Sequence, residues 1–282
     1  MIKHIPVLLD SVLDALGDIR GRRVLDATFG AGGYTRAFLN AGASVVAFDR
    51  DPNVLDDVNL VKNEFKKKFE FIARPFSTIG ELNDVFDAIV FDLGISSMQI
   101  DNPERGFSFR ADAPLDMRMS CNGPTICDMF EQWSESDIAK ILREYGDVKP
   151  ATAIAKAIKK TMPKTTFELR GLIHNPNDVA PTFQAMRIAL NDEMGELHRA
   201  LNAVPKLLNV GGKCICVTFH SLEDRIVKNT FRDWTTSPGD PRMPQTTIPQ
   251  FELLRARTPG RQEIEQNSRA RSAHMRGVVK SY

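Results

Sequence analysis

The feature that most constrains this chain is a glycine-rich turn, Phe29-Gly-Ala-Gly-Gly33, between a β-rich run and a helical pattern. The run before it is Arg23-Val-Leu-Asp26, and the pattern after it continues to about Asn40. Glycines let the backbone approach a ligand without Cβ clashes. A strand, a glycine turn and a helix in this order predict an α/β fold with a doubly wound sheet, whose ligand binds at the carboxyl ends of the strands.

The first ninety residues continue the same alternation. Apolar residues at helical spacing predict a helix from about Val7 to Leu16 that ends at Gly17, and a second helical stretch follows the glycine turn by twenty residues, from Asn53 to Lys62. Further buried strands are predicted at 44–49, 69–73 and 87–92.

Beyond Asp92 the pattern changes. Residues 102–127 are polar without a period, and short helices are predicted at 134–144, 151–161 and 165–174. We expect one longer helix that begins at about Phe183 and is ended by Pro205. The sheet should resume after it, at 211–218. The sequence thus predicts a small all-α domain at 103–182 inserted into an α/β domain made of 1–102 and 183–282. The tail beyond Ser237 has few apolar residues and is expected to extend over the surface or to be ordered by a ligand.

Several protein classes are disfavoured. The longest apolar runs are about five residues, against the ~20 that span a bilayer, and the N-terminus lacks the apolar stretch of a secretory signal. We therefore expect a cytoplasmic protein that is not bound to a membrane. The four cysteines form no C-x-x-C pair and are expected to be buried free thiols, and we predict no metal site.

The net charge of +1 comes from 37 basic and 36 acidic residues, so binding to a polyanion would need local clusters. Two windows supply them. Residues 140–170 contain eight Lys or Arg against three acids, and residues 255–280 contain seven against two. Each cluster could equally be a solvated face of the protein.

Two cofactor classes compete for the glycine turn. Asp49 ends the second predicted strand, where an acid can bind two ribose hydroxyls. A dinucleotide site would need G-x-G-x-x-G, yet here Gly33 directly follows Gly32. Asp26, four positions ahead of Gly30, suits the amino end of S-adenosylmethionine, which has no pyrophosphate. The turn therefore favours a methyltransferase over a dehydrogenase, and a plain glycine turn remains the alternative.

Two polar loops follow later strands. Asp92-Leu-Gly-Ile-Ser-Ser97 begins where the fourth strand ends, so its carboxylate could accept a hydrogen bond from a substrate amino group; the alternative is a helix-capping loop. Phe219-His-Ser-Leu-Glu-Asp-Arg225 contains His, Ser and Asp but lacks the G-x-S-x-G elbow of a hydrolase. We expect it to form a wall of the site.

Together, these segments resemble the MraW family, the ribosomal RNA small-subunit methyltransferase H enzymes. The resemblance runs in one order along nearly the whole chain, through residues 4–9, 26–33, 48–52, 92–101, 104–109, 114–119, 183–187, 219–225 and 269–272. It implies a class I methyltransferase fold with a helical insert. It also implies transfer of a methyl group from S-adenosylmethionine to the exocyclic N4 of a cytosine in the decoding region of 16S rRNA, in the small ribosomal subunit.

Site residues follow from this resemblance by position. The implied cofactor contacts are Gly32, Gly33, Tyr34, Asp49, Phe76, Asp92 and Gln99. Asp92 is also the predicted catalytic residue, because its carboxylate would orient the amino group. For the RNA we expect Phe107 and Phe109 to stack on the target base, and Arg269 and Arg271 to contact phosphates.

Three positions depart from the family pattern: Tyr34 replaces the usual His, Asp147-Val148 replaces two acids, and Ala180-Pro181 replaces Thr-Arg. The last removes a basic residue from the insert. Two other functions remain open, a methyltransferase acting on DNA or another amino-bearing substrate, and a non-catalytic RNA-binding assembly factor.

Overall fold

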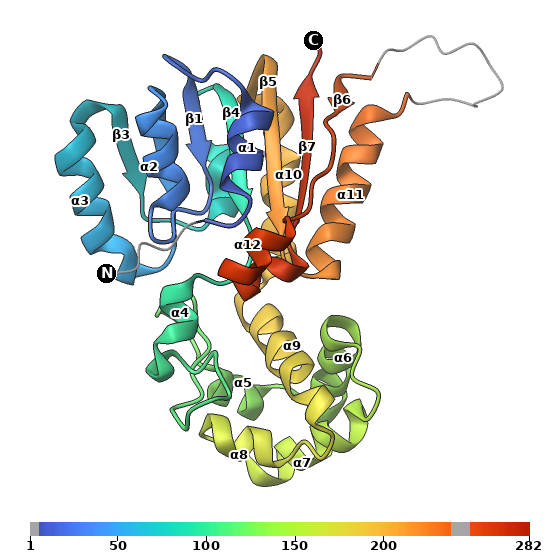
Figure 1. Cartoon of the computed structure of the whole chain (residues 1–282). Helices are drawn as coiled ribbons and strands as arrows, with labels where there is room; N and C mark the ends of the chain where they lie inside the picture. The colour runs from blue at the N-terminus through green and yellow to red at the C-terminus, as the bar shows by residue number, and fades with distance from the viewer. Residues whose placement is uncertain (1–5, 238–248) are drawn as a thin grey trace. The chain divides into compact units, whose positions relative to one another are not determined.

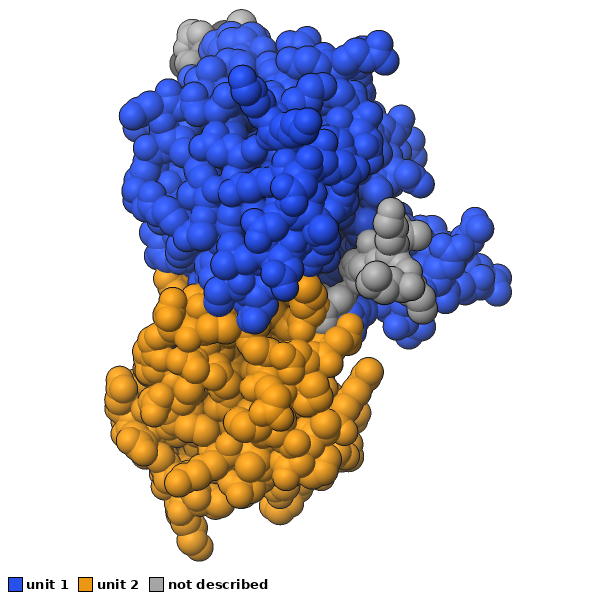
Figure 2. All heavy atoms as spheres, turned by 90° about the vertical axis from the view of Figure 1, so that its left-hand side faces the viewer, with its two compact units in different colours: residues 1–94, 194–282 blue, residues 95–193 orange. Residues whose placement is uncertain are grey.

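The chain is divided into two compact units in a computed structural model that describes residues 6–237 and 249–282 (Figures 1 and 2). Unit 1 comprises residues 1–94 and 194–282, and unit 2 comprises residues 95–193. The sequence predicts domain boundaries at 102/103 and 182/183, whereas the two units divide at 94/95 and 193/194. Unit 2 is larger than the predicted insert partly because the whole helix α9 (Val179–Asn191) belongs to it. Phe183 and Met186 of this helix pack in the core of unit 2.

Unit 1 is built on a seven-stranded sheet in the order β3-β2-β1-β4-β5-β7-β6. Its strands are β1 (Arg23–Asp26), β2 (Ser44–Phe48), β3 (Phe69–Ile72), β4 (Phe86–Asp92), β5 (Leu208–Thr218), β6 (Phe251–Leu253) and β7 (His274–Lys280). The first five run parallel, and β7 is antiparallel to both of its neighbours. The five predicted strands are confirmed. Parallel strands with helices between them form an α/β sheet, as predicted.

The C-terminal tail differs from the prediction. It contributes two strands to the sheet and the helix α12 (Arg261–Gln266), instead of lying extended over the surface. Phe251 of β6 is 2% exposed and stacks on Trp234 with ring centroids 4.9 Å apart, and Val278 of β7 is fully buried. A few well-placed apolar side chains thus suffice to fix a tail of low overall hydrophobicity. Residues 238–248 of the tail lie outside the described residues.

Besides α12, the helices of unit 1 are α1 (Leu9–Leu16), α2 (Gly33–Asn40), α3 (Leu55–Phe65), α10 (Glu193–Leu207) and α11 (Ser221–Thr235). As predicted, α1 ends at Gly17, which has φ +74° and donates its N–H to the Leu13 carbonyl at 2.9 Å. Residues of α10 and α11, including Leu201 and Phe231, pack with Ile89 and Phe91 of β4 in one buried cluster. Cys214 and Cys216 of β5 belong to this cluster as expected, whereas the other two cysteines are half-buried.

The prediction of one long helix between Phe183 and Pro205 was wrong. The chain leaves α9 at Asp192, which adopts the left-handed conformation with φ +49°, and a new helix, α10, begins at Glu193. Pro205 lies inside α10, near its end, and does not stop it. Lys280 Nζ donates to the carbonyls of Pro205 at 2.8 Å and Leu208 at 2.9 Å, so carbonyls at this helix end are satisfied by a side chain.

Unit 2 is all-α, as expected of the insert. Its helices are α4 (Ser97–Asp101), α5 (Ile126–Gln132), α6 (Glu135–Gly146), α7 (Ala151–Thr161), α8 (Thr166–Gly171) and α9. Thr125 and Ser134 form capping boxes that begin α5 and α6. Val148, at one of the positions that depart from the family pattern, is 1% exposed and packs in the core of this unit.

Across the two described ranges, no helix is both long enough and apolar enough to cross a membrane.

Candidate functional site

The glycine turn joins β1 to α2 at the carboxyl edge of the sheet. Gly32 has φ +73°, and a Cβ there would lie 2.9 Å from the Phe29 ring. At Gly33 a Cβ would lie 2.4 Å from Pro6 Cγ. Both positions therefore require glycine for steric reasons within the protein itself, and they bring the backbone of the turn close to its neighbours.

Asp26, at the end of β1, holds this turn through hydrogen bonds of its side chain. Its Oδ1 accepts the Thr28 N–H at 3.1 Å and its Oδ2 accepts the Thr35 hydroxyl at 2.6 Å. The side chain is completely buried, and burial raises its pKa to about 6. Both oxygens therefore bond to the turn and to the start of α2, so Asp26 supports this connection and has no exposed surface to offer the amino end of a cofactor.

Asp92, at the end of β4, is linked to Asp26 by Thr28, which hydrogen-bonds to both residues. Its backbone N–H donates to Thr28 Oγ1 at 2.7 Å. The residue keeps some exposed surface, but its Oδ1 is buried and has no hydrogen-bond partner among the described residues. Burial holds the pKa of Asp92 well above its usual value, and the charges of Asp26 and Glu223 raise it further. A buried, unsatisfied carboxylate among other acids is costly unless a cation or a donor binds it.

Asp49 follows β2, as predicted for a ribose-binding acid. Its Oδ2 accepts the Gly30 N–H at 2.8 Å, and its Oδ1 accepts the Asp51 N–H at 2.8 Å. Burial raises its pKa, and these two bonds oppose the shift. Since each carboxylate oxygen can accept more than one hydrogen bond, Asp49 can hold the turn and still accept hydroxyl donors.

Tyr34 and Phe76 are the remaining predicted cofactor residues in unit 1. Tyr34 is 3% exposed and donates its hydroxyl to the Val7 carbonyl, so the part of it that faces the turn is its backbone at the start of α2. Phe76 follows β3, is half-buried, and meets Phe91 edge-to-face with centroids 5.9 Å apart. Both residues therefore lie on elements that surround the carboxyl edge of the sheet.

Gln99, the seventh predicted cofactor residue, belongs to unit 2. It is 5% exposed and forms the capping box of α4, in which its Oε1 accepts the Ser96 N–H at 3.0 Å and its own N–H donates to Ser96 Oγ at 3.3 Å. The helix-capping alternative for this loop is thus present.

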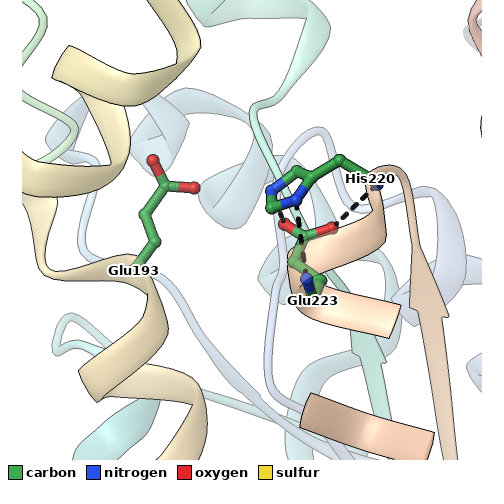
Figure 3. A group of neighbouring side chains, drawn as sticks. All are labelled: Glu193, His220 and Glu223. Atoms are coloured by element: carbon green, nitrogen blue, oxygen red, sulfur yellow. Dashed lines mark hydrogen bonds and ion pairs between the residues drawn. The ribbon is translucent and has the colours of Figure 1, made fainter. Parts of the chain in front are cut away.

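The loop after β5 places a further buried acid in unit 1. Glu223 is 2% exposed, and its Oε2 accepts the Phe219 N–H at 2.9 Å. Its Oε1 lies 3.0 Å from Nε2 of His220, close enough for an ion pair although the ring N–H is not aligned for a hydrogen bond (Figure 3). Ser221 begins α11, and Asp224 binds Arg276 of β7 at 2.7 and 2.8 Å. The His, Ser and Asp of this motif therefore form no hydrolase triad, and Glu223 is the member that sequence reasoning did not single out.

The aromatic candidates for base stacking lie in unit 2. Phe107 is 8% exposed and packs in the core, with the Arg105 guanidinium 5.7 Å from its ring centroid. Phe109 is half-buried against Phe183, edge-to-face at 5.4 Å. Sequence reasoning missed Phe167 on α8, which is 44% exposed and has the Arg170 guanidinium 5.9 Å from its ring centroid. A short amphipathic helix with one exposed aromatic beside an arginine is the signal that could have found it.

Three basic residues of the tail pair with acidic side chains. Arg257 pairs with Asp14, Arg261 pairs with Glu265, and Arg276 pairs with Asp224. Arg269 and Arg271 lie together in a 3₁₀ turn at Ser268–Ser272, where Arg271 is exposed and Arg269 is half-buried. Much of the positive charge counted in this window is therefore neutralised within the protein.

Comparison with known proteins gives concordant matches over the whole chain. The sequence model of the MraW methylase family matches residues 1–281. Proteins named ribosomal RNA small subunit methyltransferase H from Brucella anthropi and Brucella canis are each 41% identical over 305 aligned residues, covering 99% of this chain and 88% of the relative.

Among solved structures, an rRNA methylase from Streptococcus thermophilus matches with a TM-score of 0.46 at 15% identity, covering 100% of this chain and 99% of that chain. A Burkholderia thailandensis 1,6-didemethyltoxoflavin-N1-methyltransferase with bound S-adenosylhomocysteine matches with a TM-score of 0.44 at 13% identity, covering 97% and 76%.

Proposed function

This chain belongs to the MraW methylase family, and from that premise we propose that it methylates the exocyclic N4 amino group of a cytosine in the decoding region of 16S rRNA. The methyl donor is S-adenosylmethionine, the substrate is the RNA within the small ribosomal subunit, and the compartment is the cytoplasm. One observation carries the proposal. Asp92 presents a buried carboxylate oxygen without a partner among the described residues, at the strand end beside the glycine turn.

The residues of unit 1 fit the cofactor. S-adenosylmethionine carries an ammonium and a sulfonium centre, and Asp26, Asp92 and Glu223 supply negative charge close to one another at this edge of the sheet. The backbone at Gly32, Gly33 and Tyr34 would approach the cofactor, and Asp49 would accept the ribose hydroxyls. Phe76 completes the contacts that we propose in unit 1, and Gln99 is retained as a predicted contact.

The chemistry asks mainly for positioning. S-adenosylmethionine supplies a methyl group that is already activated by the sulfonium. The protein must hold the acceptor nitrogen in line at a near-attack distance of ~3 to 3.5 Å. Asp92 Oδ1 would accept a hydrogen bond from the cytosine amino group, which localises the nitrogen lone pair toward the methyl group. Asp92 would also take up the proton that the amino group loses.

The protein would hold the RNA by contacts to unpaired bases and to phosphates. A target base must be unstacked before it can enter a site, and an aromatic ring can stabilise it by ~1 to 3 kcal/mol. We retain Phe109 for this role. Phe107 would need a rearrangement of the unit 2 core to reach a base, whereas Phe167 already offers an exposed ring beside Arg170. Arg269 and Arg271 remain the proposed phosphate contacts.

The test is a nucleoside comparison by mass spectrometry. Small ribosomal subunits from cells with and without the protein are digested and compared for N4-methylcytidine, and purified protein is then given subunits or naked DNA with labelled S-adenosylmethionine. We expect the modified nucleoside only when the protein is present, and label only in the RNA. Label in DNA would instead support the DNA alternative, and RNA binding without any label would support an assembly factor.

A further inference from the structure

The N-terminal segment Pro6–Leu8 covers the glycine turn. Pro6 lies so close to Gly33 that a Cβ on Gly33 would come within 2.4 Å of Cγ and 3.0 Å of Cδ. Next to it, the Val7 carbonyl accepts the Tyr34 hydroxyl. Leu8 is 1% exposed with φ +57°, a left-handed conformation that is strained for a residue other than glycine. The surrounding contacts must therefore hold this segment in place.

A residue from the other end of the chain supplies one of these contacts. Glu263 of α12 accepts the Leu8 N–H through Oε1 at 2.6 Å, across 255 positions of sequence. Leu8 precedes the first turn of α1, so its N–H has no helical carbonyl to bond, and a buried N–H without an acceptor is costly. In Figure 1, α12 lies by the end of the β5 arrow, at the carboxyl edge of the sheet.

Tyr34, which binds the Val7 carbonyl, also feels the charges of the acids in the candidate site. Burial raises the pKa of Tyr34, and the charges of Asp92, Asp26 and Glu263 raise it further. Glu263 and the strand-end acids thus act on the same hydroxyl. Glu265, on the same helix, pairs at the surface with Arg261 at 2.9 Å.

We propose that Glu263 is a positioning residue for cofactor binding: by holding the Leu8 N–H it fixes Pro6–Leu8 over the glycine turn, so that the C-terminal segment determines how tightly S-adenosylmethionine is retained. The identity of the cofactor rests on the proposed function. The position of the segment rests on the contacts of Pro6, Val7 and Leu8. Glu263 acts through the backbone of this segment and touches no reacting atom.

The test compares Glu263→Ala, Glu263→Gln and the surface control Glu265→Ala in the full-length protein. Calorimetry measures the Kd for S-adenosylmethionine and S-adenosylhomocysteine, and hydrogen exchange measures protection of the Leu8 amide. Losing a charge-assisted bond predicts about tenfold weaker cofactor binding for Glu263→Ala. Glu263→Gln keeps a carbonyl acceptor and should restore most of the affinity, and Glu265→Ala should bind like the wild type. Leu8 should exchange faster in Glu263→Ala alone.

Tyr34→Phe removes the second anchor of the segment and completes the test. The double variant with Glu263→Ala should weaken binding by less than the product of the two single effects, because both act on one segment. If Glu263→Ala lowers the unfolding temperature but leaves the Kd unchanged, Glu263 is only structural and the inference is wrong. If the wild type itself binds neither cofactor form, the proposed function fails instead. The two failures are therefore distinguishable.

Discussion

At the scale of single residues, the acids at the carboxyl edge of the sheet are of two kinds. Some bond to the protein's own backbone and side chains, and others keep an oxygen available for a donor. Asp26 gives both oxygens to Thr28 and Thr35, whereas Asp92 keeps Oδ1 buried and without a partner among the described residues. Thr28 links the two acids, because its N–H donates to Asp26 and its hydroxyl oxygen accepts the Asp92 N–H. A carboxylate that supports a loop should affect stability, and one that awaits a donor should affect turnover.

Asp26 should make the cofactor-free protein less stable as the pH rises. Its pKa of about 6 in the folded state exceeds the value of about 3.9 in an unfolded chain, so the folded state binds the proton more tightly. The stabilising contribution is complete below about pH 4 and is lost as the pH rises through about 6. Relative to Asp26→Asn, the wild type should therefore lose about 2 kcal/mol of unfolding free energy between pH 4 and 7. Urea unfolding of both proteins at several pH values measures this, and parallel curves would contradict it.

Asp92→Asn should separate turnover from cofactor affinity. The substitution keeps the shape of the side chain but removes the charge and half of its acceptor capacity. If Asp92 orients the amino group, turnover on small ribosomal subunits should fall by about 100-fold, since it acts where charge develops. The Kd for S-adenosylmethionine, measured by calorimetry, should change much less. Equal losses in both would make Asp92 a cofactor ligand only.

At the scale of elements, unit 2 depends on the close approach of α6 and α9. Gly146, in the last turn of α6, faces α9 so closely that a Cβ would lie 2.8 Å from the Pro181 carbonyl oxygen and 2.9 Å from Val148 Cγ2. Pro181 and Val148 are two of the positions that depart from the family pattern. The structure therefore connects these departures with packing inside unit 2.

Gly146→Ala should destabilise unit 2 by about 1 to 3 kcal/mol, because the added methyl group meets backbone that cannot move freely. Gly171, at the end of α8, is the matched control, since a Cβ there would meet nothing within 4 Å. Gly171→Ala should be neutral or slightly stabilising, as alanine is the better helix former. Denaturant unfolding monitored by the unit 2 residue Trp133 would measure both changes. A neutral Gly146→Ala would show that the two helices can separate without cost.

At the scale of the whole molecule, a nearly neutral chain must hold an anionic RNA with few residues. In the tail, Arg257, Arg261 and Arg276 already pair with acids. In unit 2, Lys159 donates to the carbonyls of Phe130 at 2.7 Å and Trp133 at 2.9 Å, at the end of α5. Net charge in a sequence window thus overstates the charge that a phosphate can reach.

Replacing Arg269 and Arg271 together by Ala should flatten the log-log salt dependence of RNA binding by ~1.4 to 1.8 units, if each neutralises one phosphate. Arg276→Ala is the control: its guanidinium is held by Asp224, so it should lower stability and leave the slope unchanged. RNA affinity at several salt concentrations and cofactor affinity at one would measure this. If the slope persists while cofactor binding or stability collapses, the tail is structural. Phosphate contact would then pass to unit 2, around Lys156 and Lys160.

The sequence by itself determined the features that depend on neighbours along the chain. Five strands, the helices between the first three of them and the cap at Gly17 follow from apolar spacing and from glycine. The acids at the strand ends, Asp26, Asp49 and Asp92, could be placed at one edge because parallel strands end together.

Only the tertiary structure decided what depends on distant partners. The tail forms β6 and β7 because Phe251 and Val278 find a core built by other elements. Phe107 looks available in the sequence but is buried by helices that follow it. Glu263 meets Leu8 across 255 positions, and no local pattern records such a pairing. The physical reason is the same in each case: burial and hydrogen bonding are decided by the surfaces that folding brings together, whereas a sequence window contains only one of them.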